Sequence, residues 1–198
     1  MLIPISSISQ LANLRDLPVL AIDLGFSGSK ASCGLAFRES QGADVVPQNY
    51  RFDACVKKAA ELFASHKDSV LILEAPLSAA FNSKGNPQSR GDFEGMPKPR
   101  WWSLRAGAAM ALAAQYFLKD LSQRIPKDVR CNLIEGFITG ENSGNDADVA
   151  ASLLSSLSSV KETNWHQPQG SLIISILDWI DPSTSPHACP IVLTPFPR

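Results

Sequence analysis

Acidic residues end three apolar, strand-like runs of this 198-residue chain. The runs read LAIDLG, LILEAP and NLIEGF, and their acids are Asp23, Glu74 and Glu135. Two more acids, Asp146 and Asp148, stand at the expected start of a late helix, in GNDADVAASLL. Because burying an unpaired carboxylate costs on the order of several kcal/mol, each of these acids is expected to have a partner.

That shared partner is predicted to be a divalent cation. In a sheet with parallel strands, the carboxyl ends of neighbouring strands meet at one crevice, where several carboxylates would repel one another. Mg²⁺ or Mn²⁺ prefers such oxygen ligands and would neutralise them. Two ions about 4 Å apart activate water and stabilise the leaving oxygen of a phosphodiester, so the pattern favours a metal-dependent nuclease with a two-metal mechanism.

Each acid has a predicted role in that mechanism. Asp23 would bridge both ions, Glu74 would help hold the ion on the leaving-group side, and Asp148 or Asp146 would hold the ion that carries the nucleophilic water. Glu135 would support the site from a neighbouring strand. The catalytic set is therefore Asp23, Glu74, Glu135 and Asp148, and the metal ligands are Asp23, Glu74, Asp146 and Asp148.

Purely structural roles remain open for the same residues. Asp23 could shape a turn with Gly25, and Glu74 could pair with an arginine of the following loop. Glu135 could end a strand without touching metal. Either Asp146 or Asp148 could be the N-cap of its helix.

Periodicity and turn residues predict the elements that would position these acids. An α/β order is expected, with a short helical turn in the arm that precedes the first strand and a long loop at residues 77–102. Strands are predicted at residues 19–24, 30–38, 44–52, 69–73, 129–138, 171–180 and 190–194, the last two forming a pair. Helices are predicted at residues 52–66, 104–124 and 146–160.

The strand order and the acidic motifs resemble the RNase H-like (retroviral integrase-like) superfamily. The likeness is closer to a family of predicted nucleases formerly catalogued as a domain of unknown function, and it is carried by AIDLGFSGSKASCGLA, VLILEAPLSAAF, NLIEGF and NDADVAASLLSSL. It implies a mixed five-stranded sheet with the first three strands antiparallel, flanked by helices, and an Mg²⁺- or Mn²⁺-dependent phosphodiesterase. Asp148 takes the place of the final acid in that family's helix. The implied division is an arm at 1–18, a nuclease core at 19–160 and a C-terminal strand extension at 161–198 packed on the core.

Nucleic acid is the expected partner, although the net charge of −1 does not indicate it. Most of the cations that could meet phosphates lie in the loop at residues 77–102, where Trp101 could stack on a base or pack the following helix onto the sheet. The predicted nucleic-acid contacts are Lys30, Arg90, Lys98, Arg100 and Trp101.

Composition and motifs exclude several other classes. Four widely spaced cysteines without a CxxC pair favour reduced thiols. There is no apolar run long enough for a membrane helix and no signal-like start, so a cytoplasmic location is expected. Two other functions stay open: a binding or scaffold protein that has this fold without its chemistry, and an ATP-handling protein of the actin/sugar-kinase type. The segment around Trp179 and Ile180 is interpreted as an edge strand or a dimer contact.

Overall fold

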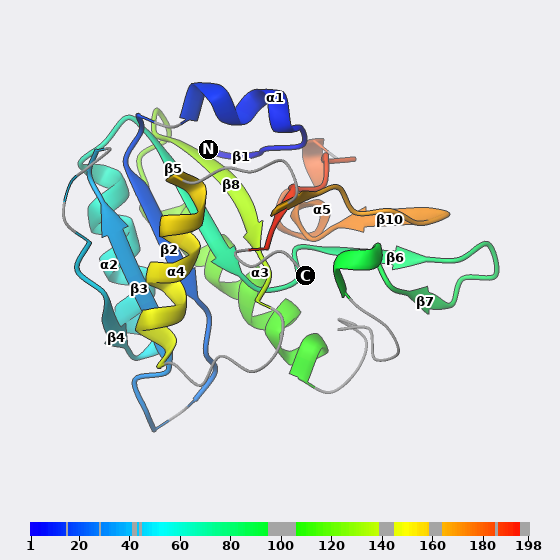
Figure 1. The fold of residues 1–198 in the computed structure, drawn as a ribbon, viewed down its shortest axis with the longest axis horizontal. Coiled ribbons are helices and arrows are strands. Elements are labelled where there is room, and N and C mark those ends of the chain that lie inside the picture. The colour runs from blue at the N-terminus through cyan, green and yellow to red at the C-terminus, as the bar shows by residue number, and fades with distance from the viewer. Residues whose placement is uncertain are drawn as a thin grey trace.

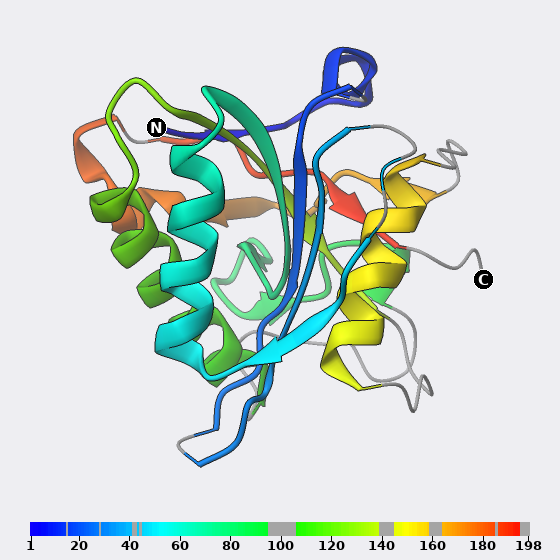
Figure 2. The ribbon, with the colours of Figure 1, turned by 90° about the vertical axis from the view of Figure 1, so that its left-hand side faces the viewer.

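The computed structural model describes residues 1–14, 16–27, 29–40, 43, 45–94, 106–138, 145–158, 164–184 and 186–194. These residues form an α/β fold built on one mixed sheet with helices on both faces (Figure 1). Seen from the side in Figure 2, the sheet has helices packed on both of its faces.

The main sheet has eight strands within the described residues, in the order β4-β3-β2-β5-β8-β11-β9, with β1 beside β8. Antiparallel pairs join β2 (Val19–Asp23) to β3 (Cys33–Arg38) and β3 to β4 (Gln48–Tyr50). Parallel pairs join β2 to β5 (Asp68–Glu74) and β5 to β8 (Arg130–Gly136). The carboxyl ends of β2, β5 and β8 therefore lie along one edge of the sheet, as the sequence predicts for adjacent parallel strands.

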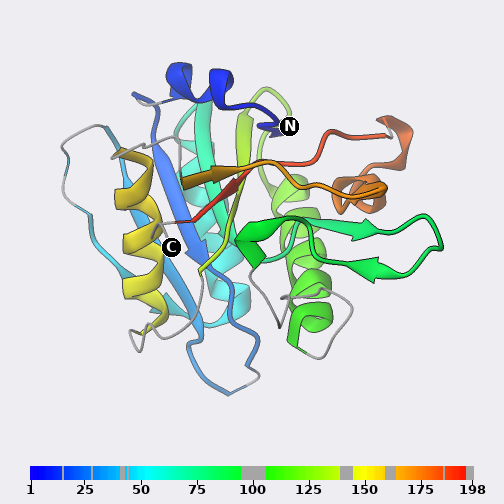
Figure 3. The ribbon, with the colours of Figure 1, turned by 45° about the vertical axis from the view of Figure 1, so that its right-hand side comes forward.

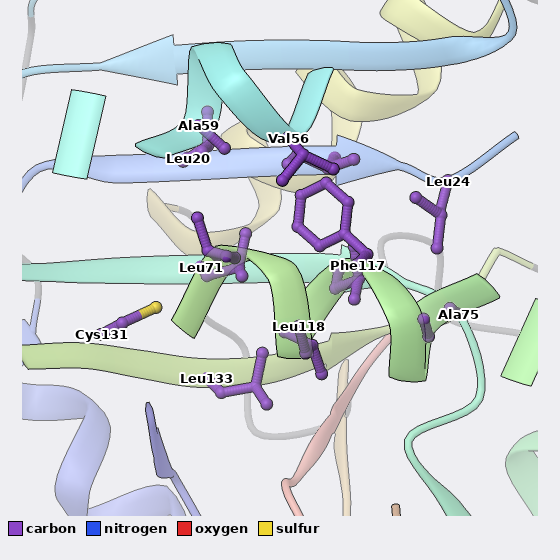
Figure 4. Close-up of a cluster of buried hydrophobic side chains, with 14 of the residues drawn as sticks. Leu20, Leu24, Val56, Ala59, Leu71, Ala75, Phe117, Leu118, Cys131 and Leu133 are labelled. Carbon is purple, nitrogen blue, oxygen red and sulfur yellow. The ribbon is translucent and has the colours of Figure 1, made fainter. Parts of the chain in front are cut away.

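Helices α2 (Phe52–Ala64) and α3 (Ala106–Arg124) cover one face of the sheet. Figure 4 shows Phe117 and Leu118 of α3 and Val56 of α2 packed over Leu20 and Leu71 of the central strands. Burial of these side chains, each worth about 2 kcal/mol, holds the two helices to the sheet.

The opposite face is covered by α4 (Asp146–Ser158). Ala150, Leu153 and Leu157 of α4 are buried against Ala21 and Ile72 of the sheet. Since β2 and β5 are buried on both faces, their sequences are nearly continuous apolar runs rather than alternating ones.

Two distant segments complete the outer edge of β8. Strand β1 (Leu2–Pro4) pairs in parallel with its first half, and β11 (Val192–Leu193) pairs in parallel with its end. The segments meet where the amide of Ile191 donates to the carbonyl oxygen of Ile5 at 2.7 Å. We call β1 and β11 together the composite strand. Beyond it, β11 pairs antiparallel with β9 (Trp165–His166).

A second sheet projects from the body of the protein (Figure 3). It contains β10 (Leu172–Ser175), β6 (Ser78–Phe81) and β7 (Pro87–Gln88), in that order. The predicted loop at residues 77–102 is thus wrong in its first part, where a hairpin turns through Gly85 at a φ of +79°. The short 3-10 turn η2 (Asp92–Glu94) follows.

The C-terminal prediction is also wrong in part. Strand β10 pairs with β6 and not with β11. Its partner lies more than ninety residues earlier in the chain, so the local sequence pattern could not identify it. The segment around Trp179 is helical, in α5 (Leu177–Ile180), which is followed by η4 (Pro182–Thr184). The predicted helical turn in the N-terminal arm is present as α1 (Ile8–Leu11) and η1 (Ala12–Leu14). The other predicted strands and helices are confirmed, with ends shifted by a few residues. None of the helices described here has the length and apolar character required to cross a membrane.

Candidate functional site

Asp23 and Glu74 are neighbours across the parallel β2–β5 pair, where they are register partners. Neighbouring strands lie about 5 Å apart, so the two carboxylates start from adjacent backbone positions. Ile22 and Leu73 belong to the core under α2 and α3. Because side chains alternate along a strand, Asp23 and Glu74 both point to the other face, which α4 covers. Glu74 is buried and Asp23 half-buried.

Helix α4 begins directly beside this pair because of a glycine. Gly34 of β3 is the register partner of Asp23 on the side away from Glu74. A Cβ atom added to Gly34 would lie 1.8 Å from the backbone oxygen of Asp146, so only glycine lets the helix start approach the sheet this closely. A glycine inside a strand often marks such an approach of another backbone, and Gly34 could have been noticed in the sequence for that reason.

The first turn of α4 presents Asp146, and not Asp148, toward the sheet. Asp146 is half-buried and lies one turn before the fully buried Ala150, on the same side of the helix. Asp148 is exposed. The preference for Asp148 as the ligand is therefore not supported by the geometry, which favours Asp146.

Neither aspartate is the N-cap. The side chain of Asn145 accepts hydrogen bonds from the backbone amides of Ala147 at 3.0 Å and Asp148 at 3.2 Å, which satisfies two donors of the first turn. The carboxylates of Asp146 and Asp148 are therefore not used to cap the helix. Burial raises the pKa of the Asp146 carboxyl above its ordinary value, because the fold removes water that would solvate its charge.

Glu135 points to the opposite face of the sheet. Its neighbour Ile134 packs in the core under α4, so Glu135 faces the other way. The register partner of Glu74 on β8 is Gly136, whose missing side chain leaves room for Leu153 of α4. The predicted contribution of Glu135 to the carboxylate cluster is wrong, because a shift of one residue in register changes the face.

The actual partner of Glu135 is Arg90. Glu135 is fully buried, and its Oε2 accepts hydrogen bonds from Arg90 Nη1 at 2.8 Å and from the backbone amide of Leu77 at 2.9 Å. Glu94 lies on the other side of the guanidinium, with Oε1 2.5 Å from Arg90 Nε. Burial alone would lower the pKa of Arg90, but Glu135 and Glu94 together raise it above its ordinary value. We call these three residues the buried triad.

The buried triad corrects the prediction for Arg90. Arg90 is 1% exposed and cannot meet a phosphate on the surface, so its assignment as a nucleic-acid contact is wrong. Arg90, an arginine of the loop that follows Glu74, pairs with Glu135 of β8. The cause of the error is that the chain after the β6–β7 hairpin packs against β8, where Arg90 is buried with Glu135, and its charge pattern gave no sign of this.

Of the other predicted nucleic-acid contacts, Lys30 lies within the described residues. Lys30 is exposed in the turn between β2 and β3, where its backbone amide donates to the hydroxyl of Ser27 at 3.2 Å. Lys98, Arg100 and Trp101 lie outside the described residues.

Comparisons with protein-family models, with curated proteins and with solved structures found no match. The site must therefore be judged by its own geometry and chemistry.

The donor set suits a hard cation such as Mg²⁺ or Mn²⁺. Two adjacent carboxylates on one face, with a third on the helix start beside them, are the oxygen ligands that these ions prefer. Within the described parts of the chain, no group of three or more His, Cys, Asp or Glu side chains is already gathered closely enough to hold an ion. Asp23 and Glu74 also make contacts of their own. Cation binding would therefore draw Asp146 toward the Asp23–Glu74 pair.

Proposed function

We propose that this protein is a metal-dependent nuclease with an RNase H-like fold, which hydrolyses phosphodiester bonds at the edge that carries Asp23 and Glu74. The observation that carries the proposal is the register of Asp23 with Glu74 on the face that α4 covers. Two carboxylates fixed side by side by a parallel sheet offer the oxygen ligands that Mg²⁺ and Mn²⁺ prefer.

The order of the strands supports the same proposal. The sheet places β4, β3 and β2 antiparallel to one another and then continues in parallel through β5 and β8. This is the arrangement that the resemblance to RNase H-like proteins implies. The edge bearing the acids is also the one at which ligands bind in open α/β sheets.

Three side chains would share the work at this site. Asp23 and Glu74 would hold the cations from the sheet, and Asp146 would complete the set from the start of α4. When bound, Mg²⁺ or Mn²⁺ would supply water activation and neutralisation of the charge that develops on the phosphodiester. The N-terminus of α4 favours negative charge, so it would also attract the substrate phosphate.

The test is a cleavage assay with purified protein on single-stranded, duplex and branched DNA and RNA, with Mg²⁺, Mn²⁺ or EDTA. Asp23→Asn, Glu74→Gln and Asp146→Asn are each expected to lower kcat by at least about a hundredfold, as for removal of a preorganised electrostatic group. Asp148→Asn is the matched control, because it removes the same charge from the same helical turn and should retain activity.

Three results would contradict parts of the proposal. Undiminished cleavage in Asp23→Asn would contradict the assignment of Asp23 as a metal ligand. Loss of cleavage in Asp148→Asn but not in Asp146→Asn would restore the role that the resemblance gives to Asp148. Tight nucleic-acid binding without cleavage under any metal condition would favour a binding protein with this fold.

A further inference from the structure

Three aromatic rings form a continuous strip that begins close to the candidate site. Phe26, in the turn after β2, meets Phe52 at the start of α2 with ring centroids 6.1 Å apart. Phe52 in turn meets Tyr116 of α3 at 5.9 Å and rests on the buried Phe117 at 6.1 Å. Phe26 is 71% exposed and Tyr116 63% exposed, so both ends of this aromatic strip face solvent.

The strip starts within reach of the carboxylates. Phe26 follows Asp23 by three residues, which limits the separation of their Cα atoms to about 11 Å. Figure 2 shows the β2–β3 turn extending past the sheet at the end where α4 begins. Side-chain alternation places Asp23 on the α4 face, whereas the strip lies on the face of α2 and α3. The β2–β3 turn therefore lies between the aromatic strip and the carboxylate edge.

Positive charge accompanies each ring. Lys30 shares the turn with Phe26, Arg51 precedes Phe52, and Lys119 follows Tyr116 on the same side of α3. All three are exposed, and among the described residues none of them has an ion-pair partner. The acids nearest in sequence to Arg51 and Lys119 are already paired, Asp53 with Lys57 at 3.7 Å and Asp120 with Arg124 at 2.8 Å.

We propose that the aromatic strip binds the unpaired bases of a single-stranded nucleic acid whose backbone passes over the β2–β3 turn to the carboxylate edge. This inference rests on the proposed nuclease function and names the strand state of its substrate. Bases inside a duplex are stacked on one another, so only an unpaired base can stack on Phe26 or Tyr116. Lys30, Arg51 and Lys119 would meet the phosphates between those bases.

A second copy of the chain is a poorer occupant of the same surface. A two-fold contact through the strip would bring the patch of one copy against the identical patch of the other. Lys30, Arg51 and Lys119 would then face their own counterparts, and like charges at an interface are costly. A polyanion suits the same cations.

The experiment measures binding without cleavage. Fluorescence anisotropy in EDTA would follow labelled single-stranded DNA and RNA 20-mers and a matched duplex. Wild-type protein should prefer the single strands. Phe26→Ala and Tyr116→Ala should each weaken single-strand binding by about fivefold to a hundredfold, the range for loss of one stacked base. Phe26→Trp should restore it.

Two further variants separate stacking from other effects. Leu172→Ala removes an apolar side chain that is 55% exposed on the projecting sheet, and it should leave binding unchanged. Lys30→Gln should reduce the slope of log affinity against log salt by about one, whereas Phe26→Ala should not. Thermal unfolding confirms that each variant is folded, and alanine at position 116 is compatible with the helix.

The outcomes distinguish this inference from the proposed function. Cleavage by wild-type protein together with unchanged binding in Phe26→Ala and Tyr116→Ala would overturn the proposed role of the aromatic strip. The proposed nuclease function would then still stand. Single-strand binding that depends on the strip, without cleavage, would support the strip and refute the nuclease. Equal or tighter binding of the duplex would overturn the inference. A change in the sedimentation of the free protein in either variant would do so too, because the strip would then join two copies.

Discussion

Asp146 and Asp148 carry the same charge two positions apart, and the first turn of α4 gives them different surroundings. Asp146 lies beside Gly34 and is half-buried, while Asp148 is exposed. The choice between them is decided by helical geometry and not by residue type. This difference makes the pair a built-in control for every experiment on the site.

The raised pKa of Asp146 predicts a pH dependence of stability. A carboxyl whose pKa is higher in the folded than in the unfolded protein holds its proton more tightly when folded. Without divalent cations, the free energy of unfolding should therefore fall as the pH rises from the ordinary pKa of aspartate through the raised value. Urea denaturation at several pH values would show this fall in wild-type protein and in Asp148→Asn, but less of it in Asp146→Asn.

Added Mg²⁺ or Mn²⁺ should reverse that effect, since a cation binds the ionised carboxylate and stabilises the folded state. A wild-type protein and an Asp146→Asn variant with identical pH profiles, with and without metal, would contradict the assignment of Asp146.

The buried triad predicts a second effect at the residue scale. Arg90→Met would leave Glu94 and Glu135 buried without their cation, and it should lower the free energy of unfolding by about 3–5 kcal/mol. Glu135→Gln should cost less, because Arg90 keeps Glu94 as its partner. Chemical denaturation of both variants measures the difference. A loss below about 1 kcal/mol in Arg90→Met would show that the triad does not secure the segment after β5.

At the scale of elements, the approach of α4 to β3 decides whether the site can form. Gly34→Ala would put a methyl group 1.8 Å from the backbone oxygen of Asp146, and a backbone cannot move aside as a flexible side chain can. We expect a loss of stability of about 3 kcal/mol, the upper end for overpacking, and a loss of nuclease activity.

Gly85→Ala is the control for that change. Gly85 has a φ of +79° and no atom within 4 Å of an added Cβ, so alanine should cost about 1 kcal/mol of backbone strain and leave activity intact. Urea denaturation and the cleavage assay together test both variants. If Gly34→Ala kept full activity, the position of Asp146 would not matter to the site.

The alternation of side chains between the two faces of a strand explains how far the site could be predicted from the sequence. LILEAP and NLIEGF look equivalent, since each ends an apolar run with glutamate. Once the strands pair, Glu74 aligns with Gly136 and points to α4, whereas Glu135 aligns with Leu73 and points away. The existence and order of the core strands could be inferred from local patterns. Register, the face of each acid and the burial of Arg90 depend on partners distant in sequence, which no local pattern contains.

At the scale of the whole molecule, the composite strand ties the two ends of the described chain to β8. Deleting residues 1–5 should remove the acceptor of the Ile191 amide and the hydrogen bonds of β1 to β8. We expect faster hydrogen exchange at Ile191 and in β11, and a lower free energy of unfolding. Exchange measured by mass spectrometry on the segment 186–194 would show the effect.

A deletion in the projecting sheet provides the comparison for that truncation. Replacing residues 82–86, at the tip of the β6–β7 hairpin, with a two-residue turn should leave exchange in β11 unchanged. Unchanged exchange at Ile191 after loss of residues 1–5 would mean that the two halves of the composite strand are independent.

The contact between Ile5 and Ile191 also has a consequence during synthesis on the ribosome. The segment around Ile5 is synthesised some 186 positions before the segment that completes the same edge. Until then, the end of β8 has an unpaired edge beyond β1, and other unfinished chains could pair with it there. Chaperone dependence of this protein should therefore be concentrated in the interval between the synthesis of β8 and the synthesis of β11.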